Sequence, residues 1–243
     1  GLGYGYVAKT TGCEAMMLYG KPMANPITLP LYRPYEKATI WEQTSVVQFA
    51  AASQMPVFLW ECMALDPEYA KIIQRHWMKD DIATLTNTYP DHEDIQGPSG
   101  YDVAKTLCEF IPGRAKVYDT EQQMFPLIRQ TATERSSESH HVTASDIAKI
   151  SQDLQAQFPY AEHPANIALV LRMASDLGIE PDRALMYMIQ HVEEDIGVLK
   201  VFPEVEFAHK SWRFINGMSA NERIGAINNW QRMALADIHP ASH

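Results

Sequence analysis

Short runs of β-forming apolar residues recur along the chain, and each one ends in polar residues. Four such runs cover residues 4–8, 57–60, 82–85 and 116–118. Apolar residues at helical spacing occupy 67–78 and 101–110, and Ser99 and Asp102 form a helix-capping pattern before the second of these segments. This alternation predicts an α/β fold with a mostly parallel sheet flanked by helices.

Polar residues stand at the ends of three of these predicted strands. Lys9 ends the first, Glu61 follows the second, and Thr86-Asn87 follow the third. In parallel α/β sheets, ligands bind outside the carboxyl ends of the strands. We therefore expect Lys9, Glu61 and Asn87 to end neighbouring parallel strands and to contribute to one site.

The remaining segments have a less regular pattern. Residues 20–39 are rich in proline and tyrosine and predict a loop, and the polar stretch 134–141 predicts a surface connection. Helical patterns cover 145–157, 164–177 and 181–191, with Pro181 suited to a first helical turn. An irregular segment, 192–212, follows them.

The C-terminal part predicts the start of a second domain. Residues 213–217 resemble a strand and turn, and Ser219 and Glu222 cap a last helix that runs to about residue 236. We expect residues 1–208 to form a central α/β domain and residues 209–243 to form the opening βα unit of another.

Charge and composition exclude several classes of protein. The 243 residues carry a net charge of −10 and no basic stripe, which argues against nucleic acid as a partner. No run approaches the roughly 20 apolar residues of a membrane helix, and the N-terminus lacks the features of a signal peptide. The three cysteines lie far apart without a CxxC pair, so a reducing cytoplasm is expected.

The loop after residue 85 carries the densest group of potential ligands, namely Asn87, Asp91, His92 and Asp94. Oxygen ligands with one imidazole suit Mg²⁺ or Mn²⁺, and the missing thiols disfavour zinc. The alternative is a solvated acidic loop in which Asp91 caps a turn.

Glu61 favours the metal interpretation. It ends an apolar run, where a carboxylate is costly unless a cation or hydrogen bonds compensate it. If the strands are close neighbours, Glu61 and His92 can share one divalent ion. The alternative for Glu61 is a hydrogen bond to a helix N-terminus.

In their order along the chain, these residues resemble the ligase subunit of poly-γ-glutamate synthetase, a capsule-forming amide ligase of the Mur-ligase type. The matching segments span nearly the whole chain: Gly5-Tyr6-Val7-Ala8-Lys9-Thr10-Thr11-Gly12, Glu42-Gln43, Glu61-Cys62-Met63-Ala64-Leu65, Thr86-Asn87, Asp91-His92-x-Asp94, Asn166-Ile167-Ala168-Leu169, Asp195-x-Gly197-x-x-Lys200 and Phe214-Ile215-Asn216-Gly217-x-x-Ala220-Asn221.

The resemblance implies that ATP phosphorylates a carboxylate and that an amino-acid amine then attacks the acyl phosphate, with Mg²⁺ or Mn²⁺ neutralising the phosphates. It implies that Glu61 and His92 bind the metal and that Asn87 orients phosphate or metal-bound water. Lys9, Thr10 and Thr11 would face the acceptor carboxylate or the γ-phosphate. The implied nucleotide contacts are Asn166 to adenine, Lys200 to phosphates, and Asn216 and Asn221 from the second domain.

Each of these assignments has a simpler alternative. Lys9 and Lys200 could be solvated charges and Asn166 an exposed or capping side chain, while Glu222 suits a helix cap better than catalysis.

Three departures from the family pattern qualify the resemblance. No GxxxxGK[ST] phosphate loop occurs, so we expect it upstream of Gly1 and the chain trimmed at both ends, without useful ATP hydrolysis alone. Lys200 replaces an arginine and loses its bidentate fork. Lys105 lies out of register with the carbamylated lysine of many Mur-type ligases, so we give it no role.

The expected substrates are ATP and glutamate or a γ-glutamyl chain. The resemblance implies a cytoplasmic enzyme at the inner face of the membrane through small membrane-protein partners, and homo-oligomerisation stays open. Two other functions remain open: a related ligase for a different amino acid or amine, and a non-catalytic subunit that lost the phosphate loop.

Overall fold

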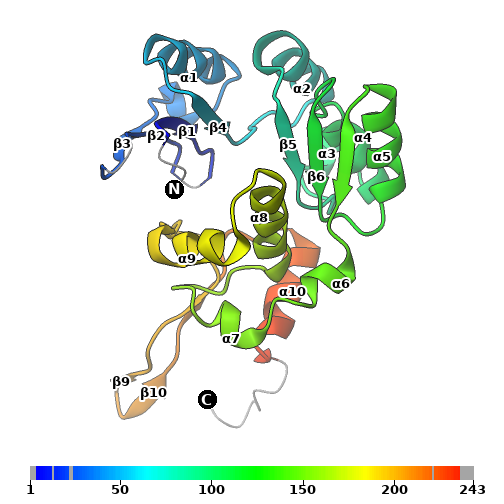
Figure 1. Cartoon of the computed structure of the whole chain (residues 1–243). Coiled ribbons are helices and arrows are strands. Elements are labelled where there is room, and N and C mark those ends of the chain that lie inside the picture. The colour runs from blue at the N-terminus through cyan, green and yellow to red at the C-terminus, as the bar shows by residue number, and fades with distance from the viewer. Residues whose placement is uncertain (1–3, 13, 22–23, 221, 236–243) are drawn as a thin grey trace.

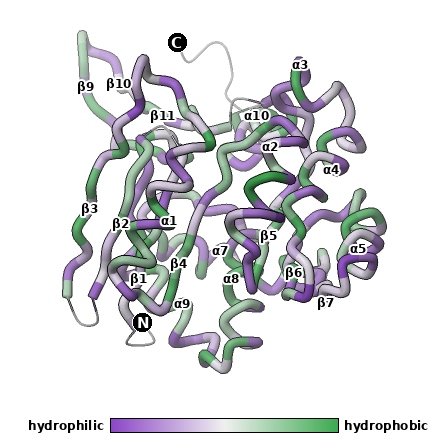
Figure 2. Tube along the Cα trace, turned by 90° about the horizontal axis from the view of Figure 1, so that it is seen from above, coloured by the Kyte–Doolittle hydropathy of each residue, from purple (hydrophilic) through white to green (hydrophobic). Residues whose placement is uncertain are grey.

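The computed structural model describes residues 4–12, 14–21, 24–220 and 222–235. Its strands form two main sheets with helices packed on them (Figure 1). The first sheet has the order β3-β2-β1-β4 and the second the order β5-β6-β7. Seen from above, the strands of the first sheet and then those of the second follow one another across the molecule (Figure 2).

The first sheet is mixed. Strand β1 (Tyr6–Lys9) pairs in parallel with β4 (Val57–Trp60) and antiparallel with β2 (Met16–Gly20). Strand β3 (Ile27–Pro30) adds an exposed antiparallel edge next to β2. The β2–β3 hairpin corrects the prediction of a loop at 20–39.

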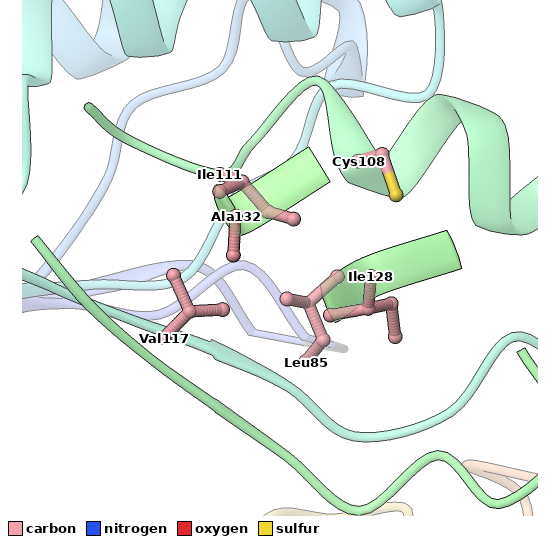
Figure 3. Packing of buried hydrophobic residues seen from close by; sticks show 6 residues of the cluster. All are labelled: Leu85, Cys108, Ile111, Val117, Ile128 and Ala132. Atoms are coloured by element: carbon pink, nitrogen blue, oxygen red, sulfur yellow. The ribbon is translucent and has the colours of Figure 1, made fainter. Parts of the chain in front are cut away.

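The second sheet is parallel throughout and contains β5 (Ile82–Leu85), β6 (Lys116–Asp119) and β7 (Glu138–His141). Leu85 and Val117 pack against Cys108, Ile111, Ile128 and Ala132 (Figure 3). Fully burying an aliphatic side chain of this size contributes about 1.5–3 kcal/mol. This core holds the ends of β5 and β6, where the polar loops begin.

Strand β7 corrects the prediction of a surface connection at 134–141. Its sequence, Glu-Ser-His-His, has no apolar alternation. Its imidazoles fit into the sheet through polar and ring contacts instead. His140 stacks on Tyr118, and His141 binds Asp119 through Nδ1 at 2.7 Å.

Helices cover both sheets and make the connections between strands. Around the first sheet lie η1 (Pro34–Glu36) and α1 (Trp41–Ala52). Around the second lie α2 (Pro67–Ile72), which continues as the π-helical turn η2 (Ile73–Met78), α3 (Glu93–Gln96), α4 (Gly100–Cys108) and α5 (Phe125–Glu134). The predicted Ser99 cap of α4 is present, because its hydroxyl accepts from the N–H of Asp102 at 3.2 Å.

The chain after β7 lies mostly below the two sheets in Figure 1. It contains α6 (Ala144–Ile147), α7 (Gln152–Gln155), α8 (Pro164–Asp176), α9 (Pro181–His191) and α10 (Arg223–Arg232). The one helix predicted at 145–157 is therefore two short ones, and Ser151 caps the second. The cap of α10 is Glu222, whose Oε1 accepts from the N–H of Gly225 at 2.7 Å.

Short strands occupy the segment predicted to be irregular. Strand β8 (Lys200–Val201) pairs with β11 (Ile215–Asn216), and the hairpin of β9 (Val205–Phe207) and β10 (Lys210–Trp212) extends from them. The predicted domain boundary near residue 208 falls in the turn of this hairpin. Among the described residues, no helix combines the length and apolar character that crossing a membrane requires.

Candidate active site

One group of sequence-predicted residues meets at the ends of β1 and β4. The N–H of Glu61 donates to the carbonyl oxygen of Lys9 at 3.0 Å, which extends the parallel pairing by one residue. The Glu61 carboxylate then accepts from the backbone N–H of Thr11 at 2.7 Å. Thr10 closes the turn, because its hydroxyl accepts from the N–H of Met16 at 3.1 Å. The carboxyl ends of β1 and β4 thus carry Lys9, Thr10, Thr11 and Glu61, as predicted; we call this the Lys9 edge of the first sheet.

The amine of Lys9 is buried and paired at this edge. Its Nζ lies 3.1 Å from Oε1 of Glu42, and its side chain is inaccessible to solvent. Arg33 binds the same carboxylate through two nitrogens, at 2.8 and 2.9 Å. Burial lowers the pKa of Lys9, and the Glu42 carboxylate opposes that effect. A paired, buried Lys9 rules out the solvated-lysine alternative.

The thiol next to Glu61 is not a reactive group. Burial raises the pKa of Cys62 to about 12, so the thiol stays protonated at neutral pH. Its Sγ accepts from the N–H of Ala64 at 3.4 Å. Cys62 therefore has a structural role in the turn that leaves β4.

The loop after β5 exposes its predicted ligands. The Asn87 Oδ1 accepts from the N–H of Tyr89 at 3.1 Å, which forms a local turn. His92 has a left-handed backbone with φ 47°, and its N–H donates to Asp91 Oδ1 at 2.8 Å. Asn87 and His92 are both solvent-exposed. Their side chains can therefore reach a ligand without further unfolding of the loop.

The base of this loop is held from the next strand. Glu121, which follows β6, accepts from the backbone N–H of Thr88 at 2.9 Å and from its hydroxyl at 3.1 Å. The other oxygen of Glu121 accepts from the N–H groups of Gln123 and Met124, at 2.8 and 3.2 Å. Both Glu121 and Thr88 are buried. This carboxylate therefore ties the Asn87 loop to the start of α5.

A cleft of about 950 Å³ opens between this loop, the start of α8 and the C-terminal helix α10. Its lining includes Asn87, Glu121, Glu162, Asn166, Asn229 and Arg232. The volume is within the range of small-molecule and cofactor sites, about 300–1,000 Å³. The lining is rich in amide and carboxylate groups, which suits a polar ligand.

Asn166 projects into the cleft from the first turn of α8. Its Nδ2 donates to Glu162 Oε1 at 2.9 Å. Glu162 also accepts from the hydroxyl of Tyr160 at 2.6 Å and from the N–H of His163 at 2.8 Å. Asn166 is thus neither a helix cap nor a free surface residue, and Glu162 holds it on the cleft wall.

Helix α10 is tied to the same region through Arg232. Its Nη2 donates to the carbonyl oxygens of Ala161 and Glu162, at 2.9 and 2.8 Å. Burial lowers the pKa of Arg232, and the nearby Glu162 carboxylate opposes this shift. Arg232 therefore connects the C-terminal helix with the residues that hold Asn166.

The remaining predicted residues lie elsewhere. Lys200 and Asn216 lie opposite each other in the pairing of β8 with β11. The Lys200 amine forms an ion pair with Glu194, and Nδ2 of Asn216 donates to the carbonyl oxygen of Ile196 at 2.7 Å. Neither lines the cleft. Asn221 lies outside the described residues. Lys105 is on α4 with its Nζ 5.7 Å from the Tyr101 ring centroid.

The expectation that Lys9, Glu61 and Asn87 end neighbouring strands is only half right. Strands β1 and β4 are neighbours, whereas β5 belongs to the other sheet and pairs with β6. The indole N–H of Trp60 on β4 donates to Oδ1 of Asp80, a residue shortly before β5, at 2.8 Å. The two sheets are therefore connected by side chains, and the Asn87 loop is separate from the edge that holds Glu61.

The potential metal ligands are sparse. Across the described ranges, no group of three or more His, Cys, Asp and Glu side chains is arranged to hold a metal ion. A shared ion between Glu61 and His92, with water and phosphate as other ligands, stays a prediction.

Residues that the sequence did not single out complete both regions. They are Arg33 at the Lys9 edge, and Glu121, Glu162 and Arg232 around the cleft. Glu121 and Arg232 act on residues more than 30 positions away in the sequence, which leaves no local pattern. The partner of Glu162 is four residues on and that of Arg33 nine residues on, so these two pairs were within reach of a local reading. The position of Glu121, two residues after the end of β6, could also have suggested a role.

No family model matches the chain. Two curated bacterial proteins match nearly all of it. The chain is 29% identical over 231 residues to PGA synthase CapB of Bacillus subtilis (strain 168), which covers 95% of this chain and 57% of that protein. It is 30% identical over 232 residues to capsule biosynthesis protein CapB of Bacillus anthracis, covering 95% and 48%. The chain thus spans about half the length of these relatives.

Solved structures match the whole fold at low identity. E. coli FolC in complex with ADP has a TM-score of 0.63 at 15% identity, covering 96% of this chain and 60% of that one. A bifunctional folylpolyglutamate synthase/dihydrofolate synthase with Mn, AMPPNP and L-glutamate has a TM-score of 0.60 at 14% identity, with the same coverage. These likenesses establish the fold class, an α/β fold of the Mur-ligase type.

Proposed function

We propose that this chain, a homologue of the CapB capsule-synthesis proteins, carries the ATP- and metal-binding region of an amide ligase that extends a γ-linked glutamate chain. The observation that carries the proposal is the cleft lined by both Asn87 and Asn166, which the resemblance assigns to opposite parts of ATP. The homology over 95% of the chain supports the reaction class.

The proposed reaction has two steps. A carboxylate oxygen of the acceptor attacks the γ-phosphorus of ATP, and ADP leaves. The amine of glutamate then attacks the carbonyl carbon of the acyl phosphate, loses a proton, and expels phosphate with the original carboxylate oxygen. Catalysis of this type depends mostly on positioning and on compensation of phosphate charge.

The cleft fits the nucleotide in this scheme. Asn166 would contact the adenine, and Asn87 would orient a phosphate or a metal-bound water from the loop after β5. From the other sheet, Lys9, Thr10 and Thr11 would face the acceptor carboxylate or the γ-phosphate. Lys9 is held by Glu42 at 3.1 Å, so its positive charge is partly compensated. It would position the turn that Thr10 and Thr11 form as well as attract an anion.

Glu61 and His92 would hold the divalent cation. A carboxylate and an imidazole suit Mg²⁺ or Mn²⁺, which binds through few protein groups and takes its other ligands from water and phosphate. Because Glu61 and His92 follow strands of different sheets, the ion would have to join the two sheets. Bound there, the ion would neutralise charge on the transferred phosphoryl group. Glu61 already accepts from the N–H of Thr11, which leaves its second oxygen for the metal.

The second domain and the partners complete the proposal. Residues 209–243 would open a further domain that brings Asn216 and Asn221 toward the nucleotide, and Lys200, just before that domain, would approach the phosphates. Glutamate or a γ-glutamyl chain would be the amine donor. The enzyme would act in the cytoplasm, at the inner membrane face through small membrane proteins.

The test is ADP formation by the full-length protein with ATP, Mg²⁺ and a γ-glutamyl acceptor. We expect release of ADP only when glutamate is also present, and no stimulation by other amino acids at the same concentration. Stimulation by a different amine would identify the related ligase of another specificity. ATP turnover that ignores every amine and acceptor would overturn the proposed function.

A further inference from the structure

The Glu162 carboxylate fixes the orientation of the Asn166 amide. Its Oε1 lies 2.9 Å from Nδ2 of Asn166 and 2.8 Å from the backbone nitrogen of His163, and its Oε2 lies 2.6 Å from the Tyr160 hydroxyl. Because Oε1 already accepts from the His163 N–H, it faces Asn166 as a hydrogen-bond acceptor. The amide must therefore present its NH₂ group to Glu162, and its oxygen must point elsewhere.

The groups that remain on Asn166 face the cleft. Its Oδ1 makes no hydrogen bond with any residue in the described part of the chain, and Nδ2 has a second N–H beyond the one that Glu162 receives. The side chain lines the cleft. Asn166 therefore offers an acceptor and a donor side by side to a ligand.

This pair of groups distinguishes between purines. The exposed edge of adenine carries an acceptor at N7 and an amino donor at N6, which match the amide N–H and Oδ1 of Asn166. A 6-oxopurine carries acceptors at both positions, so its O6 would oppose Oδ1. A freely rotating amide could not avoid this mismatch fully, but it could weaken it by turning its NH₂ toward O6.

We propose that Glu162 is a positioning residue that selects adenine over 6-oxopurine nucleotides, because it prevents that rotation of the Asn166 amide. The inference rests on the proposed function, since it requires a nucleotide in the cleft. It adds a determinant of base specificity that lies behind the contacting side chain.

A helix-capping role for Glu162 would give a different result. Glu162 precedes α8 and accepts from a backbone N–H there, as Glu180 does before α9. Glu180 accepts from the N–H groups of Asp182 and Arg183, at 3.1 and 2.8 Å, and is not part of the cleft lining. Glu180→Gln is therefore a matched control, which changes a capping carboxylate without affecting Asn166.

The experiment measures the dissociation constants of ADP and of inosine diphosphate, which has a 6-oxo group, for the full-length protein and its variants. Wild type should prefer ADP on the order of tenfold or more, the discrimination typical of a paired amide contact. In Glu162→Gln the new side-chain amide can donate or accept, so the Asn166 amide can rotate. The ratio of the inosine diphosphate to the ADP dissociation constant should then fall severalfold toward one. Glu180→Gln should keep the wild-type preference.

An unchanged preference in a folded Glu162→Gln protein would overturn the inference and leave the proposed function in place. If Glu162→Gln does not fold, Asn166→Ala takes its place, and the inference requires that this variant bind both nucleotides equally. A preference for ADP that survives Asn166→Ala would also overturn it. Failure of wild type to bind any nucleotide would remove the proposed function itself.

Discussion

The buried carboxylate of Glu121 receives both the backbone N–H and the hydroxyl of Thr88, at 2.9 and 3.1 Å. Thr88 is the residue after Asn87, so this pairing determines where the Asn87 loop begins. No cation is needed for the arrangement, because two further N–H groups at the start of α5 complete the hydrogen bonding of Glu121. Glu121 thus holds the loop on one side of the cleft, together with the Thr120 hydroxyl, which donates to the carbonyl oxygen of Thr86.

Glu121→Gln should therefore loosen the loop. In this variant an NH₂ group replaces one of the two carboxylate oxygens of Glu121. Each of those oxygens accepts from a backbone N–H group, so at least one buried N–H loses its acceptor. We expect a loss of about 1–3 kcal/mol of unfolding free energy and weaker ADP binding. Urea denaturation and nucleotide titration measure the two effects. Glu180→Gln should lose stability but keep its ADP affinity, and equal loss of affinity in both variants would contradict the role of Glu121.

The Lys9–Glu42 pair predicts a large stability effect. Their side chains are 0% and 9% exposed, so Glu42→Gln leaves a buried ammonium without its counter-charge. We expect a loss of about 3 kcal/mol in chemical denaturation. The control is Glu68→Gln, since the Glu68–Lys71 pair is exposed and should contribute less than about 1 kcal/mol. Similar small losses in both variants would show that the buried pair is not important for stability.

The same carboxylate predicts how stability depends on acid. Burial by itself would raise the pKa of Glu42, but hydrogen bonds from Arg33 and Lys9 outweigh it and hold the pKa below its ordinary value of 4.5. The unfolded chain therefore binds a proton first as pH falls. The stabilisation is present above that ordinary value and is lost as pH falls through the lowered pKa. Glu42→Gln should lose less stability over this acid range than wild type, and parallel pH profiles would contradict this.

The metal assignment gives a prediction for Glu61 and His92. Glu61→Gln keeps the acceptor for the Thr11 N–H but removes the charge that would offset Mn²⁺, so Mn²⁺ affinity should fall about tenfold or more. His92→Ala should act similarly, and the double variant should be little worse than either, because both disable one ion. Excess Mn²⁺ should restore the single variants partly. Glu93→Gln, which changes an exposed residue at the start of α3, is the control. Wild-type Mn²⁺ affinity in Glu61→Gln would end the assignment.

Strands made of four successive β-forming residues between polar segments were predictable from the sequence, and strands held by polar contacts were not. Residues 57–60 and 82–85 form strands with the predicted bounds. Strand β7 was missed because His140 and His141 are stabilised by Tyr118 and Asp119 from β6, a neighbour distant in sequence. Strand β3 was missed because all four of its residues are exposed, so no apolar face indicates it.

The candidate site also contains features that were predictable from the sequence and features that were not. Lys9 and Glu61 meet because β1 and β4 pair in parallel, as the alternation of strands and helices predicted, although the β2–β3 hairpin lies between them in the sequence. The separation of Asn87 from that edge could not be predicted, because it depends on which strands pair across the molecule. Arg232 was missed since its partners are backbone carbonyls, which carry no sequence signature.

Arg232 should connect helix α10 to nucleotide binding. Its two hydrogen bonds to the carbonyl oxygens of residues 161 and 162 are made from a partly buried position. Arg232→Gln removes the fork, so we expect the start of α8 and helix α10 to exchange amide hydrogens faster and ADP to bind severalfold more weakly. Arg223→Gln, at the exposed start of α10, is the matched control. Unchanged exchange in α10 of the Arg232 variant would contradict the connection.

The acyl phosphate is the central claim about the chemistry, and an isotope transfer tests it directly. The acceptor carboxylate is labelled with the heavy oxygen isotope, and the full-length protein is given ATP, Mg²⁺ and glutamate. Because phosphate leaves with one carboxylate oxygen, mass spectrometry of the released phosphate should find one labelled oxygen for each amide formed. Amide formation with unlabelled phosphate, or with AMP and pyrophosphate as products, would contradict this account.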